Sequence, residues 1–200
     1  MKTRAFAFAL ATTALVGLSA CNNNGGGNGE APKAQTSAAE KAAGNKTIAA
    51  GLDANGKFMA AAKAAGLDQT LAGPGPYTVF VPDDAAIGSA PAGTFDATPA
   101  NRAQLTGILT NMILPGTVLV ADIDKAIDTG KGKASLATMG GGTLTATKEG
   151  GKTVLTDAEG HKASVTGDDE YSNGVVHHVD AVLMPAKGEA AKPAVGQKAG

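Results

Sequence analysis

Apolar and polar positions along the chain follow two different periods, which separate a helical part from a strand-rich part. The stretch KFMAAAKAAGL has apolar residues at helical spacing and ends near Gly66, so it predicts a helix over Lys57–Leu67. The β-prone run YTVFVP predicts a strand over Tyr77–Pro82. Asp83 and Asp84 come directly after it and are suited to capping a short helix.

The strongest helical pattern begins after Thr98-Pro99, a good N-cap and first-turn pair. Its apolar residues recur at i, i+3, i+4, i+7 and i+8, which is one face of a helix: Leu105, Ile108, Leu109, Met112 and Ile113. Pro115-Gly116 ends this pattern. The following run TVLVADI predicts another strand over residues 117–123.

From Lys133 onward, short β-prone runs are separated by glycines, and the last run is VVHHVDAVLM. The order of helices first and hairpins later predicts an α+β domain with an antiparallel sheet. The stretch NGVVHHVDAVLMP, Asn173–Pro185, is interpreted as a turn followed by the closing core strand.

Both ends of the chain lack the residues of a core. Residues 22–46 contain no large apolar side chain, so we expect residues 21–46 to be a flexible tether. Residues 187–200 are similarly poor in core residues and are expected to form a flexible tail. The predicted folded domain therefore covers residues 47–186.

The first twenty residues indicate export. Lys2 and Arg4 precede an apolar stretch of about a dozen residues, too short for a membrane span, which needs about 20. The sequence LSAC then ends at Cys21 and resembles a bacterial lipoprotein signal, in which the cysteine is lipidated and becomes the first mature residue. The alternative is an ordinary cleaved secretory signal. Asn22 stands where an aspartate would favour retention at the inner membrane, so we expect the outer membrane, on its periplasmic or outer side.

Composition excludes some classes of function. Aromatic residues make up 4% of the chain and tryptophan is absent, so a large stacking surface for bases or sugars is not expected. The net charge is -1 and no block of Lys and Arg occurs, which argues against nucleic-acid binding. With one cysteine, an internal disulfide is impossible.

The segments from residue 47 to 185, taken in order, resemble a fasciclin domain. The two most telling pieces are YTVFVPDDAAI and NGVVHHVDAVLMP, with NRAQLTGILTNMILPG between them. The positions that carry the resemblance are Tyr77, Thr78, Phe80, Pro82, Asn173, Gly174, His177 and Asp180. The resemblance implies a β-sandwich or wedge with several flanking short helices, used mostly in extracellular adhesion and without reaction chemistry.

One position departs from the family. The family commonly carries a Tyr-His pair just before its Pro-Gly, in a region thought to contact cell receptors in animal members, whereas this chain has Asn111-Met112 there. Met112 lies on the apolar stripe and is interpreted as a core residue. Receptor binding of the animal type is therefore not expected.

Two adjacent histidines raise the question of a metal or catalytic site. In a strand, His177 and His178 point to opposite faces, so their nitrogens do not converge on one metal ion. We expect His177 to be buried and hydrogen-bonded to backbone. His178 is expected near solvent, where it could pair with Asp180.

Other candidate sites are weaker. A hydrolase triad of Ser172, His177 and Asp180 lacks the G-x-S-x-G turn. The acidic run ADIDKAID lacks the glycine and glutamate of a calcium loop, and a capped helical turn explains it. We expect no catalytic residue, no metal and no cofactor. Asp168, Asp169 and Glu170 are interpreted as a solvated loop that could serve as an interaction patch.

Together these features predict a lipid-anchored module of the cell envelope that mediates adhesion by binding a protein or glycan. The alternative is a carrier that binds a small apolar ligand in a cleft of the domain.

Overall fold

The computed structural model describes residues 45–187 of the 200-residue chain. The expected export signal, nearly all of the tether with Cys21, and all but the first residue of the C-terminal tail lie outside these residues. Within the described part, no helix combines the length and the apolar character needed to cross a bilayer.

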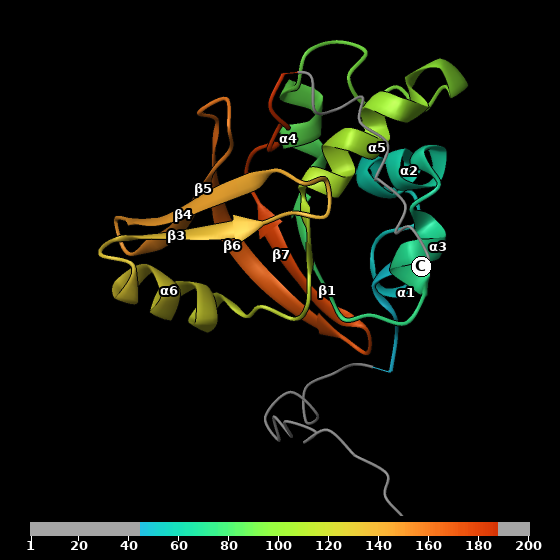
Figure 1. The fold of residues 1–200 in the computed structure, drawn as a ribbon. Coiled ribbons are helices and arrows are strands. Elements are labelled where there is room, and N and C mark those ends of the chain that lie inside the picture. The colour runs from blue at the N-terminus through green and yellow to red at the C-terminus, as the bar shows by residue number, and fades with distance from the viewer. Residues whose placement is uncertain (1–44, 188–200) are drawn as a thin grey trace, which may run out of the picture. The chain divides into compact units, whose positions relative to one another are not determined.

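Most helices precede the run of strands from Lys133 onward, as expected from the sequence (Figure 1). The helices are α1 (Ile48–Gly51), α2 (Lys57–Ala65), α3 (Asp68–Ala72), α4 (Asp84–Ser89), the 3-10 helix η2 (Pro99–Asn101), α5 (Arg102–Asn111) and α6 (Val120–Thr129). The strands are β1 (Tyr77–Pro82), β2 (Ile113–Pro115), β3 (Lys133–Ala137), β4 (Thr143–Glu149), β5 (Lys152–Thr156), β6 (Lys162–Tyr171) and β7 (Gly174–Val179).

The seven strands pair in the order β2-β1-β7-β6-β5-β4-β3. All neighbouring pairs are antiparallel except β1 and β7, which run parallel with Phe80 opposite His177. Strand β6 belongs to two parts of the sheet: Lys162–Ser164 pairs with β5, whereas Val165–Tyr171 pairs with β7 after an irregularity in register. The α+β class is thus confirmed, and the sheet is mixed.

Helices lie on both sides of this sheet. Helices α2 and α5 contact each other beside β1 and β7, and α6 packs against β3, β4 and β5 (Figure 1). The core between the helices and the sheet is mainly aliphatic, with two buried phenylalanines, and includes fully buried Leu105, Ile108, Leu109 and Met112. This matches the apolar stripe seen in the sequence.

Local signals account for most element ends. Gly66 ends α2 with a φ of 78°, in the left-handed region that glycine enters without steric cost. The side chain of Asp83 accepts a hydrogen bond from Ala86 N at 2.6 Å and so caps α4. Pro99 stands in the first turn of η2, which leads directly into α5, although Thr98 makes no side-chain cap.

Three predictions of local structure were wrong. Residues 117–123 are not a strand, because Val120, Ile123 and Ile127 repeat at helical spacing and belong to α6. The sequence places Ile113 on the helical stripe, but the residue lies in β2 and pairs with Val79, because this part of the chain runs beside β1. Residues 168–170 are part of β6 rather than a loop, since pairing with β7 outweighs the low strand propensity of acidic residues.

Candidate functional site

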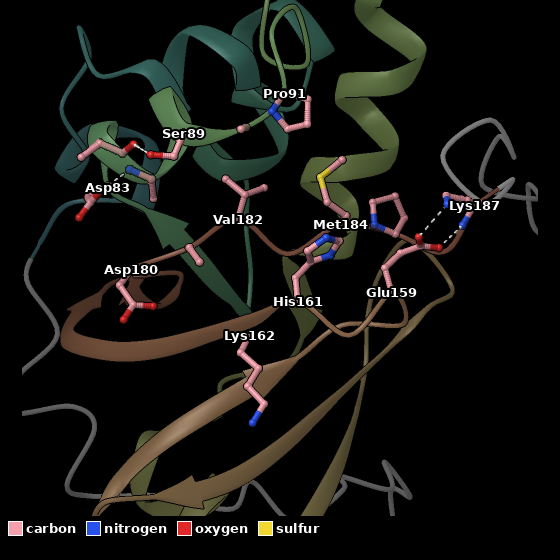
Figure 2. Close-up of a pocket in the computed structure, with 15 residues that line it drawn as sticks. Asp83, Ser89, Pro91, Glu159, His161, Lys162, Asp180, Val182, Met184 and Lys187 are labelled. Carbon is pink, nitrogen blue, oxygen red and sulfur yellow. Dashed lines mark hydrogen bonds and ion pairs between the residues drawn. The ribbon is translucent and has the colours of Figure 1, made fainter.

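A groove of about 850 Å³ lies beside the end of β7. One wall consists of α4 and the residues after it, from Ala85 to Pro91, and the other is the β5–β6 turn with Glu159 and His161. The chain that leaves β7, residues 180–187, lines the groove between them with Val182 and Met184 (Figure 2). This volume is within the range of about 300 to 1,000 Å³ that is usual for ligand sites.

Asp157 holds two parts of the groove together. Its side chain is fully buried and accepts hydrogen bonds from Glu159 N and His161 N at 2.9 Å and from Met184 N at 2.7 Å. Nδ1 of His161 lies 2.9 Å from the same carboxylate. A single buried carboxylate therefore fixes both the turn and the chain opposite α4.

Two further pairs of contacts hold this chain segment in place. Asp180 accepts a hydrogen bond from Ser164 N at 2.6 Å, and its own N–H donates to Ser164 O at 3.2 Å. At the other end Lys187 N donates to Glu159, and the ammonium group of Lys187 lies 3.5 Å from the same side chain. The predicted pairing of Asp180 with His178 does not occur, because Asp180 is engaged by the backbone of β6.

His177 occupies the centre of the sheet and is fully buried. Its Nε2 lies 2.8 Å from the carbonyl oxygen of Val118, and its Nδ1 lies 2.9 Å from Asp168. The carbonyl can only accept, so Nε2 donates to it, while Nδ1 faces the carboxylate of Asp168. The ring also packs on Phe80, with centroids 5.5 Å apart. Both nitrogens are occupied, which favours a structural role over a catalytic one.

His178 points away from His177. Its side chain is 40% exposed, and Nε2 lies 2.8 Å from Asp169. Asp168 and Asp169 therefore pair with different histidines on opposite faces of β6. Glu170, half-buried, shares the face of Asp168, so the three carboxylates do not form one continuous patch.

Asn173 ties the helices to the start of β7. Its side-chain oxygen accepts from Ile48 N, and its amide nitrogen donates to the carbonyls of Leu71 and Gly73, each at 2.8 Å. Its own carbonyl accepts from Tyr77 N at 3.0 Å. These four bonds make the turn before β7 an anchor of the fold.

Close packing surrounds the same turn. A Cβ on Gly174 would stand 1.9 Å from the carbonyl oxygen of Tyr77, so a side chain does not fit there. On β1, the hydroxyl of Thr78 donates to Gly116 O and accepts from Val118 N, both at 2.8 Å. Pro82 is buried where β1 ends. The positions that resemble the family therefore make structural contacts.

The Asn111–Met112 position lies inside the domain. Met112 is fully buried at the end of α5, as its place on the apolar stripe suggested. Asn111 is 3% exposed, and its side-chain oxygen lies 3.4 Å from the hydroxyl of Thr138. Neither side chain is presented to a partner.

The acidic run of α6 has a local explanation. Asp122 accepts a hydrogen bond from Leu119 N at 3.3 Å at the start of the helix. Asp124 accepts from the Thr153 hydroxyl at 2.7 Å, which lowers the pKa of this carboxyl, and it also pairs with Lys148 at 3.2 Å. Among residues 45–187, no three His, Cys, Asp or Glu side chains gather as metal ligands would.

The groove was missed in the sequence. Its residues come from three separate segments, around positions 83–91, 159–162 and 180–187, and only the tertiary structure brings them together. The one available signal was Asp157 in the turn DAEG, where aspartate commonly accepts bonds from the following N–H groups.

Comparisons with known proteins agree with the fold. The family model described as Fasciclin domain matches residues 55–185. A pair of FAS1 domains from the insect cell adhesion molecule Fasciclin I superposes with a TM-score of 0.61 at 19% identity, over 71% of this chain and 52% of that one. This likeness shows the fold.

Several bacterial proteins are similar in sequence. Protein sll1483 of Synechocystis sp. is 33% identical over 141 residues, which cover 69% of this chain and 71% of that protein. Immunogenic protein MPB70 of Mycobacterium bovis is 31% identical over 111 residues, or 56% of this chain and 51% of that protein. The chain thus spans about half the length of MPB70 and of the insect domain pair.

Proposed function

The chain belongs to the fasciclin domain family, and from this premise we propose that it is a non-catalytic module of the cell envelope that mediates adhesion. It would be held in the membrane by lipid on Cys21 and would bind a protein or glycan through the exterior of the domain. The observation that carries the proposal is the family match over residues 55–185. The LSAC sequence before Asn22 supports the lipid anchor and placement at the outer membrane.

Contacts inside the domain support a binding role rather than catalysis. The histidine that attracts attention in the sequence, His177, uses both ring nitrogens to join β7 to Val118 and β6. The solved relative is described as a cell adhesion molecule, and MPB70 is named an immunogenic protein. These descriptions belong to those proteins and are consistent with a role at the cell surface here.

The anchor is tested by Cys21→Ser. We expect the wild-type protein to remain with membranes after a carbonate wash and the variant to be released, because a thioether-linked lipid is the only proposed attachment. Separation of inner and outer membranes then tests the expected location. Retention of the variant in the washed membrane would contradict lipidation at this residue.

Adhesion is tested with cells that lack the protein and with a soluble fragment covering residues 46–185. The deletion should reduce attachment to a surface or to other cells, and the fragment should compete with intact cells. Attachment that is unchanged in the deleted strain, together with no partner captured from the native envelope, would refute the adhesion role.

The groove favours a second candidate, a carrier of a small apolar ligand. Its volume and its Ala, Pro, Val and Met lining are typical of sites for small molecules. Native mass spectrometry of protein purified from its own envelope, followed by solvent extraction, checks this. A stoichiometric apolar compound in the extract would support the carrier, and an empty domain that binds cells would support adhesion.

A further inference from the structure

We propose that the groove beside α4 is a docking site for an extended peptide segment that carries a basic side chain among small apolar ones. This inference assigns a surface and a class of partner to the proposed binding function, and it therefore rests on that proposed function.

The main chain that lines the groove has hydrogen-bonding groups to offer. Residues 182–186 belong to no helix or strand, and within the described part of the chain no hydrogen bond involves the backbone of Ala181 or Val182, which line the groove and are partly exposed; Leu183 beside them is fully buried. The segment is held at both ends, by Asp180 on β6 and by Met184 on Asp157. An extended peptide can pair with such a fixed, unpaired stretch as an added strand.

The side chains that line the groove are small or flat. Ala85 and Ala86 of α4 face it from one side, Pro91 closes one end of that wall, and Val182 and Met184 supply half-buried apolar surface. Such a lining accepts small apolar side chains at alternate positions of a strand.

Charge distinguishes one end of the groove. Asp83 and Asp180 both line it, and Figure 2 shows them at the same end, away from the pair formed by Lys187 and Glu159. Each of the two aspartates binds a backbone N–H through one oxygen, and neither has a cationic partner among residues 45–187.

The basic residues of the groove are already engaged. Lys162 lies 2.6 Å from Glu149, Lys187 lies 3.5 Å from Glu159, and His161 is held by the buried carboxylate of Asp157. The unmatched charge is therefore the negative one of Asp83 and Asp180. A lysine or arginine of the bound peptide would complement it.

The probe is a blocked hexapeptide, AVKAVA, titrated into the isotope-labelled full-length chain while backbone amides are followed by NMR. Matched peptides replace the lysine with glutamine or glutamate, and a fourth is N-methylated at alternate positions. We expect amides of residues 181–184 to shift, the lysine peptide to bind tightest, and N-methylation to abolish binding because the main-chain donors are lost.

Variants test the two carboxylates. Asp83→Asn and Asp180→Asn keep the side-chain oxygen that accepts the backbone N–H, so the fold is retained while the charge is removed. Each should weaken binding of the lysine peptide by roughly fivefold at low salt, the factor for about 1 kcal/mol, and leave the glutamine peptide unaffected. The matched control is Asp122→Asn, another exposed aspartate at a helix start, on α6. Ala85→Trp should block all peptides by filling the groove.

The outcomes separate this inference from the adhesion role. No shift at residues 181–184, affinities independent of peptide charge, or equal binding of the N-methylated peptide would each overturn peptide docking. The same variants are then compared in cell attachment. If the wild-type protein binds the peptide and cells that carry Ala85→Trp still attach normally, the groove is a peptide site that does not serve adhesion. If Ala85→Trp abolishes both peptide binding and cell attachment, the groove serves adhesion.

Discussion

His177→Ala is the substitution for which the structure makes the sharpest stability prediction. The side chain is fully buried, joins β7 to the carbonyl of Val118 and to Asp168, and packs on Phe80. Its neighbour His178 supplies the matched control, since it lies on the same strand but is 40% exposed and contacts a carboxylate that is also exposed.

The expected cost follows from what the truncation leaves behind. The Val118 carbonyl loses its partner, at about 1 to 3 kcal/mol for a buried unsatisfied group. The missing ring leaves a cavity against Phe80, for which about 2 kcal/mol is a low value among core truncations. Asp168 is 46% exposed, so water replaces its lost bond. We therefore expect His177→Ala to reduce the free energy of unfolding by about 3 to 5 kcal/mol. The loss of one buried hydrogen bond to the backbone would alone account for about 1 to 3 kcal/mol.

Urea unfolding followed by circular dichroism, with the slope compared between variants, measures this difference. For His178→Ala we expect a loss of about 1 kcal/mol or less, the usual value of an exposed ion pair. Equal losses for the two variants, or a loss below 1 kcal/mol for His177→Ala with an unchanged slope, would refute the assignment of His177 as a buried tie.

Three further predictions concern packing and pH. Met112→Ala should lower stability by about 2 to 5 kcal/mol, because Met112 is fully buried, while the folded fraction binds partners normally; a binding defect without a stability loss would contradict this. The hydroxyl of Thr153, with Lys148, lowers the pKa of Asp124 below its ordinary 3.8, so the stabilisation is present above that pH and is lost as pH falls through the lower folded-state value; Thr153→Val should reduce this acid-dependent part in urea titrations, and Lys148 retains the rest. Burial raises the pKa of Tyr171 above 10.0, and Asp169 adds to the effect. The resulting stabilisation is present below pH 10.0 and is lost as pH rises through the folded-state pKa, and Tyr171→Phe should be free of this alkaline loss, as ultraviolet titration and unfolding can show.

Local patterns were sufficient for much of the fold. The strand over Tyr77–Pro82 has the predicted ends, α2 starts at Lys57 as predicted, and Asp83 caps the next helix. In each case the deciding interactions are between residues close in sequence, through period, capping or glycine geometry. The α+β class follows from the order of these elements.

Prediction failed where distant segments decide the local structure. Residues 168–170 have the composition of a loop, but β7 supplies a strand partner, and Ile113 leaves its helical stripe because β1 lies beside it. Likewise nothing near His177 in the sequence identifies Val118, 59 residues away, as its partner.

The sequence alone therefore determined several elements, the core stripe of α5 and membership of the family, because periodicity and short motifs are properties of neighbouring residues. The partners of the histidines, the turn anchored by Asn173 and the groove between α4 and residues 180–187 were decided only by the tertiary structure. Each joins segments tens of residues apart, and the contact that gives such a side chain its role exists only after the sheet has brought those segments together.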